Sequence, residues 1–168
     1  MNSIFSKYFI QSFLYKQNKH HRHGVFLHTL RVVYYTLKNK DYKLVPAAFY
    51  HDFGKPFVAY EKEEDIINNE FSFTDHEEKS YQIIKNWFFL SDYTKEMVRY
   101  HYLIRDIHKA NKKGDVERYT EKKAIWDNLP NSYHKDLRRF LKYDDLGKGM
   151  NKTLKDDFPS YNKEDNKN

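Results

Sequence analysis

The stretch Ala47-Ala48-Phe49-Tyr50-His51-Asp52-Phe53-Gly54-Lys55-Pro56 holds the chemistry around which this chain is organised. An imidazole and a carboxylate, His51 and Asp52, stand side by side where an apolar run ends. The two alanines before them are small enough to let another helix approach closely. Gly54 and Pro56 predict the end of a helix, because glycine tolerates positive φ and proline cannot continue a hydrogen-bonded helix. Since a plain helix end would look the same, a metal site requires further ligands elsewhere in the chain.

Composition places the chain among soluble proteins of one domain. Its 168 residues are enough for a substantial core, although tyrosine, phenylalanine, lysine and asparagine are unusually frequent. Cysteine is absent, so disulfides and thiolate zinc sites are excluded and a metal would be held by histidine and carboxylate. No apolar run approaches the roughly 20 residues that cross a bilayer, and residues 1–15 lack a cleavage-site signature. We therefore expect a cytoplasmic protein with one helical domain over residues 1–150 and a charged, flexible tail over 151–168.

The net charge of +6 is distributed unevenly. Eight Lys or Arg residues and one acidic residue, Asp41, lie in residues 1–43, whereas residues 52–92 hold ten acidic residues and four lysines. A basic surface beside an acidic middle follows. Basic patches attract polyphosphates and nucleic acid, but in a lysine-rich chain they also serve as plain solvated surface. Nucleic acid therefore stays open as a partner.

Apolar residues recur at helical spacing along most of the chain, and the alternation typical of strands is absent. Thr74 followed by Glu77 matches a capping box, in which the Thr hydroxyl and the Glu carboxylate bind free backbone N–H groups, so His76 falls in a first helical turn. Residues 57–73 are expected to form an acidic loop with a short helix at 63–68. The fold class is therefore all-α, and the other expected helices cover residues 3–15, 24–38, 43–53, 74–88, 93–110, 120–128 and 132–146.

Six imidazole or carboxylate side chains lie on or at the edge of these helices. One is in an almost wholly apolar helix, one shares a stripe with Met97, and one ends the apolar stripe that contains Phe140. A helical bundle can point ligands from several helices into one cavity, so distance along the sequence is no objection. Four imidazoles and two carboxylates would hold two divalent transition metals and leave positions for water. The candidate metal ligands are His28, His51, Asp52, His76, His101 and Asp144.

These residues resemble the signature of HD-domain proteins, a superfamily of metal-dependent phosphohydrolases. The matching stretches are His28-Thr29-Leu30-Arg31-Val32, His51-Asp52-Phe53-Gly54-Lys55-Pro56 and Tyr143-Asp144-Asp145-Leu146-Gly147. The resemblance spans about residues 24–149. It implies a single HD-type bundle of about six to seven helices around a central metal site.

His76 and His101 resemble the extra histidines of superfamily members that bind two metals. The implied cofactor is therefore one or two divalent ions, chosen from Mn, Fe, Ni, Co, Mg and Zn. The sequence around His51 and His76 is similar to that of the HD domain of bacterial tRNA nucleotidyltransferases. This chain does not include the nucleotidyltransferase domain of those enzymes. Asp145 competes with Asp144 for the last ligand position, and the helical phase of the preceding apolar stripe favours Asp144.

The resemblance implies hydrolysis of a phosphoester by metal-activated water, with Asp52 holding metal and Lys55 stabilising charge on the phosphoryl group or leaving oxygen. Lys55 is equally compatible with an exposed loop lysine. The expected partner is a phosphorylated small molecule: a nucleotide, a cyclic nucleotide including a 2',3'-cyclic phosphate, or a nucleic-acid end. The alternatives are a non-catalytic protein that binds nucleotide or nucleic acid and a di-iron HD-type oxygenase.

Two further groups of residues complete these expectations. Four basic residues are expected to hold substrate phosphates: Arg105, Lys109, Arg138 and Arg139. The alternative is that they only form a solvated face. The histidines expected at the surface or behind the ligands are His20, His21, His23, His108 and His134.

Overall fold

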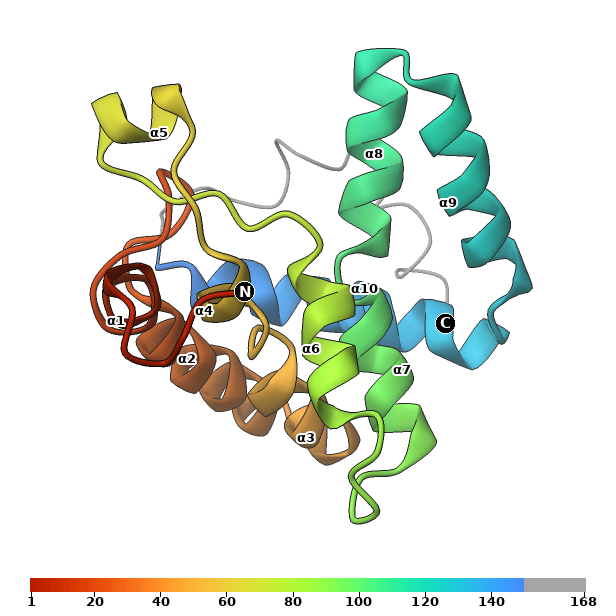
Figure 1. Cartoon of the computed structure of the whole chain (residues 1–168). Coiled ribbons are helices and arrows are strands. Elements are labelled where there is room, and N and C mark those ends of the chain that lie inside the picture. Colours follow the sequence, from red (N-terminus) through yellow and green to blue (C-terminus); the bar gives the residue numbers. More distant parts are fainter. Residues whose placement is uncertain (150–168) are drawn as a thin grey trace.

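Helices joined by short loops make up the computed structural model, which describes residues 1–149 (Figure 1). Over these residues it contains ten α-helices and one 3-10 helix, η1, and no strand; an isolated antiparallel bridge joins Tyr60 and Ser72. Seven helices have eight or more residues, in agreement with the six to seven expected. The bounds are α1 (Lys7–Leu14), α2 (Val25–Lys38), η1 (Tyr42–Leu44), α3 (Val45–Tyr50), α4 (Lys55–Val58), α5 (Glu63–Asn68), α6 (His76–Ile84), α7 (Asp92–Tyr100), α8 (Leu103–Lys113), α9 (Val116–Asn128) and α10 (Asn131–Gly147).

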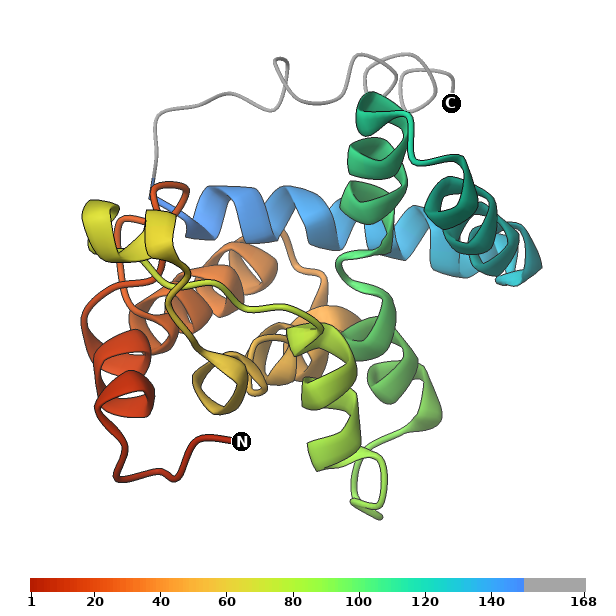
Figure 2. The ribbon, with the colours of Figure 1, turned by 45° about the horizontal axis from the view of Figure 1, so that its top comes forward.

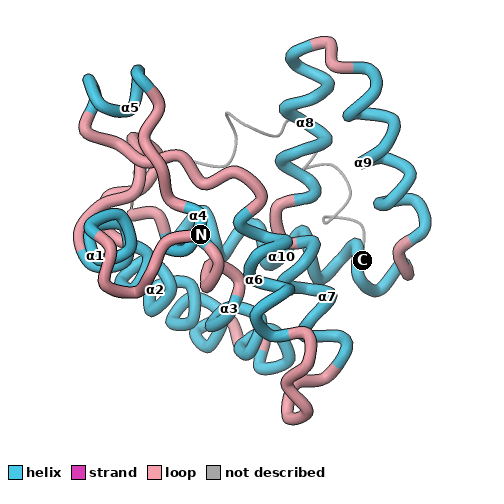
Figure 3. Tube along the Cα trace, viewed as in Figure 1, coloured by secondary structure: helices cyan, strands magenta, loops and turns pink. Residues whose placement is uncertain are grey.

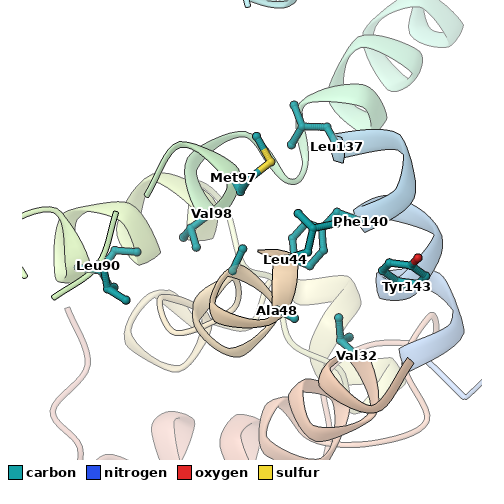
Figure 4. Close-up of a cluster of buried hydrophobic side chains, with 11 residues drawn as sticks. Val32, Leu44, Ala48, Leu90, Met97, Val98, Leu137, Phe140 and Tyr143 are labelled. Atoms are coloured by element: carbon teal, nitrogen blue, oxygen red, sulfur yellow. The ribbon is translucent and has the colours of Figure 1, made fainter. Parts of the chain in front are cut away.

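The longest helix, α10, packs along α2, and α2 packs in turn on α3 (Figure 2). α1 covers α2 and α4 on one side, while α8 and α9 form a hairpin that projects from the other (Figure 1). Apolar side chains from α2, α3, α7 and α10 meet in the middle, among them Val32, Ala48, Met97 and Phe140, all fully buried (Figure 4). This core holds the four elements in fixed relative positions.

The structure bears on the membrane and tail expectations to different extents. No helix within residues 1–149 is both long and apolar enough to cross a bilayer. The tail predicted for residues 151–168 lies outside the described residues, so it stays a prediction together with the domain limits.

The helix expected over residues 43–53 is interrupted in the structure. α3 ends at Tyr50, residues 51–54 form turns, and α4 begins at Lys55. Pro56 lies in the first turn of α4, where its missing N–H is no loss, so it opens a helix instead of closing one. Gly54 lies against α6: a Cβ there would be 2.4 Å from the carbonyl oxygen of His76 and 2.6 Å from the nitrogen of Ser80. The turn after α3 is thus pressed into the interior.

The single helix expected over residues 93–110 is two helices. α7 ends at Tyr100 and α8 begins at Leu103, so His101 and Tyr102 form a corner between them (Figure 3).

The helix expected over residues 120–128 begins earlier, at Val116, because the carboxylate of Asp115 accepts the backbone N–H of Arg118 and caps it.

The capping box predicted at Thr74 is wrong. The Thr74 hydroxyl instead hydrogen-bonds with the Tyr60 hydroxyl at 2.8 Å. The N-cap residue is Asp75, whose φ of 55° lies in the left-handed region and whose side chain makes no capping hydrogen bond. α6 begins at His76, so this histidine does lie in the first turn, although the backbone of Asp75 and not a capping box sets the start.

Candidate metal centre

His51 and Asp52 lie in the turn after α3 with side chains 0 % and 1 % exposed. The close approach of this turn to α6 forces both side chains inward. His51 Nδ1 lies 2.9 Å from the carbonyl oxygen of Ala48 and donates its proton there. The hydrogen bond selects the tautomer that leaves a lone pair on Nε2, which faces the interior.

α2 and α10 complete a first cluster around His51. His28 Nε2 lies 3.3 Å from His51 Nε2, 3.3 Å from Asp52 Oδ2 and 3.0 Å from Asp144 Oδ1. His51 Nε2 lies 3.2 Å from Asp52 Oδ2 and 3.8 Å from Asp144 Oδ1. Phe140, one turn before Asp144, packs edge-on against the His51 ring and holds it in place. The first cluster therefore comprises these two imidazole nitrogens and two carboxylate oxygens.

α6 and the corner after α7 supply a second cluster. His76 Nε2 and His101 Nε2 lie 3.5 and 3.7 Å from Asp52 Oδ1. His76 Nδ1 donates to the carbonyl oxygen of Phe73 at 3.0 Å, and His101 Nδ1 donates to that of Val98 at 2.7 Å. As for His51, the backbone orients each ring so that Nε2 points at the carboxylate.

The donor atoms of the two clusters fit metal ions. Among the described residues, Asp52 Oδ1 and His101 Nε2 are buried without a hydrogen-bond partner. A buried polar atom left unsatisfied costs about 1–3 kcal/mol, so the protein alone does not satisfy this array. Neutral imidazole nitrogens and carboxylate oxygens suit divalent transition metals, and Asp52 presents one oxygen to each cluster. The residues present therefore fit metal binding, and Asp52 would contribute one oxygen to each cluster.

Comparison with protein families agrees with this centre: the family model of the HD domain matches residues 25–129. The chain belongs to the HD domain family. The match includes His28, the His51–Asp52 pair, His76 and His101 and ends before Asp144, which the structure brings to the first cluster. A search of curated proteins and of solved structures finds no match. Buried histidines and aspartates that can bind metal are typical of HD domains.

The two adjacent aspartates of α10 point in different directions in this HD domain. Asp144 faces the first cluster, as the helical phase predicted. Asp145 pairs with the Arg105 guanidinium and with Lys148 Nζ, the latter at 2.6 Å. Both cations also lie 3.7 Å from Asp144 Oδ2, but Asp144 Oδ1 lies 3.0 Å from His28 Nε2, so the geometry favours Asp144 as the ligand candidate.

Lys55 is buried, not an exposed loop lysine, with its side chain 7 % exposed. Its Nζ lies 2.7 Å from Asp52 Oδ2 and donates to Gln17 Oε1 at 2.9 Å. Gln17, itself buried, belongs to the loop between α1 and α2. The ammonium group of Lys55 is thus held at the edge of the centre by Asp52 and Gln17.

Of the four basic residues expected to hold phosphate, two lie near the centre and two lie elsewhere. Arg105 Nη2 lies 3.7 Å from Asp144 Oδ2, and Lys109 Nζ hydrogen-bonds with the hydroxyl of Tyr102, whose ring packs on His76; both are therefore close to the centre. The other two are directed elsewhere. Arg139 pairs with Asp41 at 2.9 Å and with Asp136 at 2.6 Å, and Arg138 lies over the ring of Trp126.

Burial and neighbouring charges set the protonation of the centre. Burial lowers the pKa of His51, and burial together with the charge of Lys55 lowers the pKa of His76 well below 6.5. Burial opposes the charge on Asp52, but His51 and Lys55 outweigh it and hold its pKa well below the usual range. For His28 burial is again the largest effect, yet hydrogen bonds to the carboxylates of the first cluster raise its pKa. Neutral imidazoles beside charged carboxylates are the forms that ligate metal.

His21, which the sequence placed only at the surface or behind the ligands, lies directly against the centre. Its ring lies edge-to-face on that of His28, with centroids 5.0 Å apart, and its pKa is lowered well below 6.5 by burial and by the charge of Lys55. It stands in a polar stretch, residues 18–23, with four other basic or histidine residues, so periodicity offers no signal for it. His134, in contrast, stacks on Trp126, with ring centroids 4.2 Å apart.

Proposed function

We propose that this HD domain is a metal-dependent phosphohydrolase that cleaves phosphodiesters and cyclic nucleotides, including 2',3'-cyclic phosphates, in preference to nucleoside monophosphates. The observation that supports this most is the placement of Asp52, with Oδ2 3.3 Å from His28 and Oδ1 3.5 Å from His76. Two cation sites that share one carboxylate suit an in-line displacement, in which both the attacking and the leaving oxygen need stabilisation.

The six ligand candidates and Lys55 have distinct roles in this proposal. Divalent ions bound by the six side chains would supply Lewis acidity and a bound water that ionises near neutral pH. Lys55 Nζ, held by Gln17 beside Asp52, would donate to a phosphoryl oxygen and stabilise the charge that develops there. The buried setting strengthens this interaction because little water competes for it.

Substrate orientation falls to the cations around the centre. Arg105 lies on the Asp144 side and Lys109 on the His76 side, so a phosphate chain or a nucleotide could contact both through charge-assisted hydrogen bonds. Arg139, occupied by Asp41 and Asp136, has no part in this proposal. The similarity to the HD domain of bacterial tRNA nucleotidyltransferases stays a prediction and adds RNA ends to the substrates to be tested.

A substrate panel tests the proposal. Metal-free protein is loaded with Mn, Co, Ni, Mg or Fe and incubated with 5'-monophosphates, 3',5'- and 2',3'-cyclic nucleotides and short RNA, with products separated by chromatography. We expect cleavage of at least one cyclic or diester substrate, and a loss of about 10²–10³-fold or more in Lys55→Met, which removes a charge stabiliser. Arg138→Met is the matched control and should keep its rate.

Other outcomes of the same experiment are informative. If fully metallated protein leaves every substrate intact, the hydrolase proposal is wrong. Oxygen consumption specific to the iron-loaded protein would identify an oxygenase instead. Salt-sensitive nucleic-acid binding that survives Asp52→Ala, without turnover in the parent protein, would indicate a non-catalytic binding protein.

A further inference from the structure

The loop between α1 and α2 reaches the first cluster through His21. The backbone N–H of His21 donates to the carbonyl oxygen of Asn18 at 2.9 Å, closing a tight turn. His21 Nδ1 lies 3.0 Å from Asn18 Oδ1. Because the amide oxygen accepts the Nδ1 proton, the lone pair of the imidazole is left on Nε2. The turn therefore fixes both the position and the tautomer of this histidine.

The same loop is anchored to the elements that carry the centre. The backbone N–H of Arg22 donates to the carbonyl oxygen of Lys148, one residue past α10, at 3.0 Å. Gln17 donates through Nε2 to the carbonyl oxygen of His23 at 3.1 Å and accepts from Lys55 through Oε1. The loop is thus held at the end of α10, the helix that carries Asp144, and also at Lys55.

His21 Nε2 is a buried nitrogen that no hydrogen-bond partner satisfies within the described residues. The ligand atoms of His21, His28 and Asp144 lie within 4.8 Å of one another, the range expected for donors that share one ion. The perpendicular ring contact between His21 and His28 brings the two imidazoles together without stacking them face to face. A lone pair that is buried, oriented and unsatisfied beside two ligand candidates is suited to coordination.

We propose that His21 is an additional side-chain ligand of the metal ion held by the first cluster. The proposal rests on the metal centre of the proposed function and goes beyond it, since it adds an imidazole donor beside His28 and Asp144. More side-chain donors mean tighter binding and fewer positions for water. The first cluster would therefore hold an ion more tightly than His76, His101 and Asp52 would hold one.

Cobalt binding tests this assignment without relying on catalysis. Metal-free full-length protein, His21→Ala and His21→Gln are titrated with Co²⁺ against a chromophoric chelator, and their visible spectra are recorded. His20→Ala, a change of the exposed neighbour in the same loop, is the matched control. We expect the dissociation constant of the tighter Co²⁺ site to rise at least about tenfold in both His21 variants. The dissociation constant of the weaker site should change little.

Two further readouts separate ligation from packing. Loss of a nitrogen donor should change the position and intensity of the Co²⁺ ligand-field bands, and added imidazole should restore the bands and the affinity of His21→Ala. If both His21 variants match His20→Ala in affinity and spectrum, or if affinity falls with an unchanged spectrum and no rescue, His21 is not a ligand. If the parent protein itself takes up no Co²⁺, the metal centre fails and with it the proposed function.

Discussion

At the scale of single residues, the centre depends on a carboxylate having two oxygens. Asp52 Oδ2 lies 3.2 Å from His51 Nε2, and Asp52 Oδ1 lies 3.7 Å from His101 Nε2. Its side chain is 1 % exposed, so water cannot satisfy either oxygen and both need partners inside the protein. One residue thus joins two groups of imidazoles that otherwise come from different parts of the chain.

Metal content should therefore respond unequally to two substitutions. We expect about two ions per chain in the parent protein, about one in His101→Gln, and well below one in Asp52→Asn, because the amide keeps the shape but loses the bridging charge. Elemental analysis after gel filtration in trace metal measures this. His134→Gln, which alters the ring stacked on Trp126, should retain about two. Full metal content in Asp52→Asn would contradict the bridging role.

At the scale of elements, the decisive contact is that of the turn after α3 with α6. The Gly54 N–H donates to Ser80 Oγ at 2.8 Å, and this hydroxyl donates to the carbonyl oxygen of His76 at 2.8 Å. The contact satisfies buried polar groups of both elements, and it sets Asp52 opposite His76. Helix propensity alone would not produce it, because it depends on two segments more than 20 residues apart.

Substitution of Gly54 by alanine should break this contact. A Cβ would lie within 2.6 Å of two backbone atoms of α6, which cannot rotate away as a side chain would. We expect Gly54→Ala to lower the free energy of unfolding by about 1–3 kcal/mol, measured by urea denaturation. Gly114→Asn is the control, since nothing surrounds a Cβ there and asparagine tolerates its φ of 69°; it should cost less than about 1 kcal/mol. Equal costs for the two variants would contradict the packing explanation.

At the scale of the whole molecule, the centre draws on α2, the turn after α3, α6, the corner after α7 and α10. These elements surround one apolar core, so the ionisable groups are buried together with it. Burial lowers the pKa of His21, His51 and His76 relative to 6.5 and the surrounding carboxylates raise that of His28. Global stability is therefore linked to the protonation of the centre.

The metal-free protein should lose stability on acidification from pH 7.5 to 5.5. A lowered pKa means that the folded histidine binds fewer protons than the unfolded one in this range, so acid favours unfolding; three such histidines outweigh His28, whose raised pKa acts oppositely. Each proton by which the states differ contributes about 1.4 kcal/mol per pH unit. Urea denaturation with a chelator at several pH values measures the slope, and His76→Gln should reduce it. Greater stability at pH 5.5 would refute the linkage.

Much of the fold and of the site could be predicted from the sequence, and the exceptions share a cause. The all-α class and most helices followed from apolar periodicity, which is a local property. The break between α7 and α8 at His101 was missed, because the helical pattern continues through it while tertiary packing bends the backbone. The capping box predicted at Thr74 was wrong for a similar reason, since the Thr74 hydroxyl hydrogen-bonds with the Tyr60 hydroxyl across a loop.

The sequence by itself determined which residues have metal-binding chemistry, because His and Asp at helix edges beside apolar neighbours can be recognised along the chain. Only the tertiary structure decided how these side chains are shared: Asp52 between two clusters, Arg139 with Asp41 and Asp136, and His21 against His28. Such partnerships depend on the approach of segments distant in sequence. That approach is set by the packing of the core, which no local pattern records.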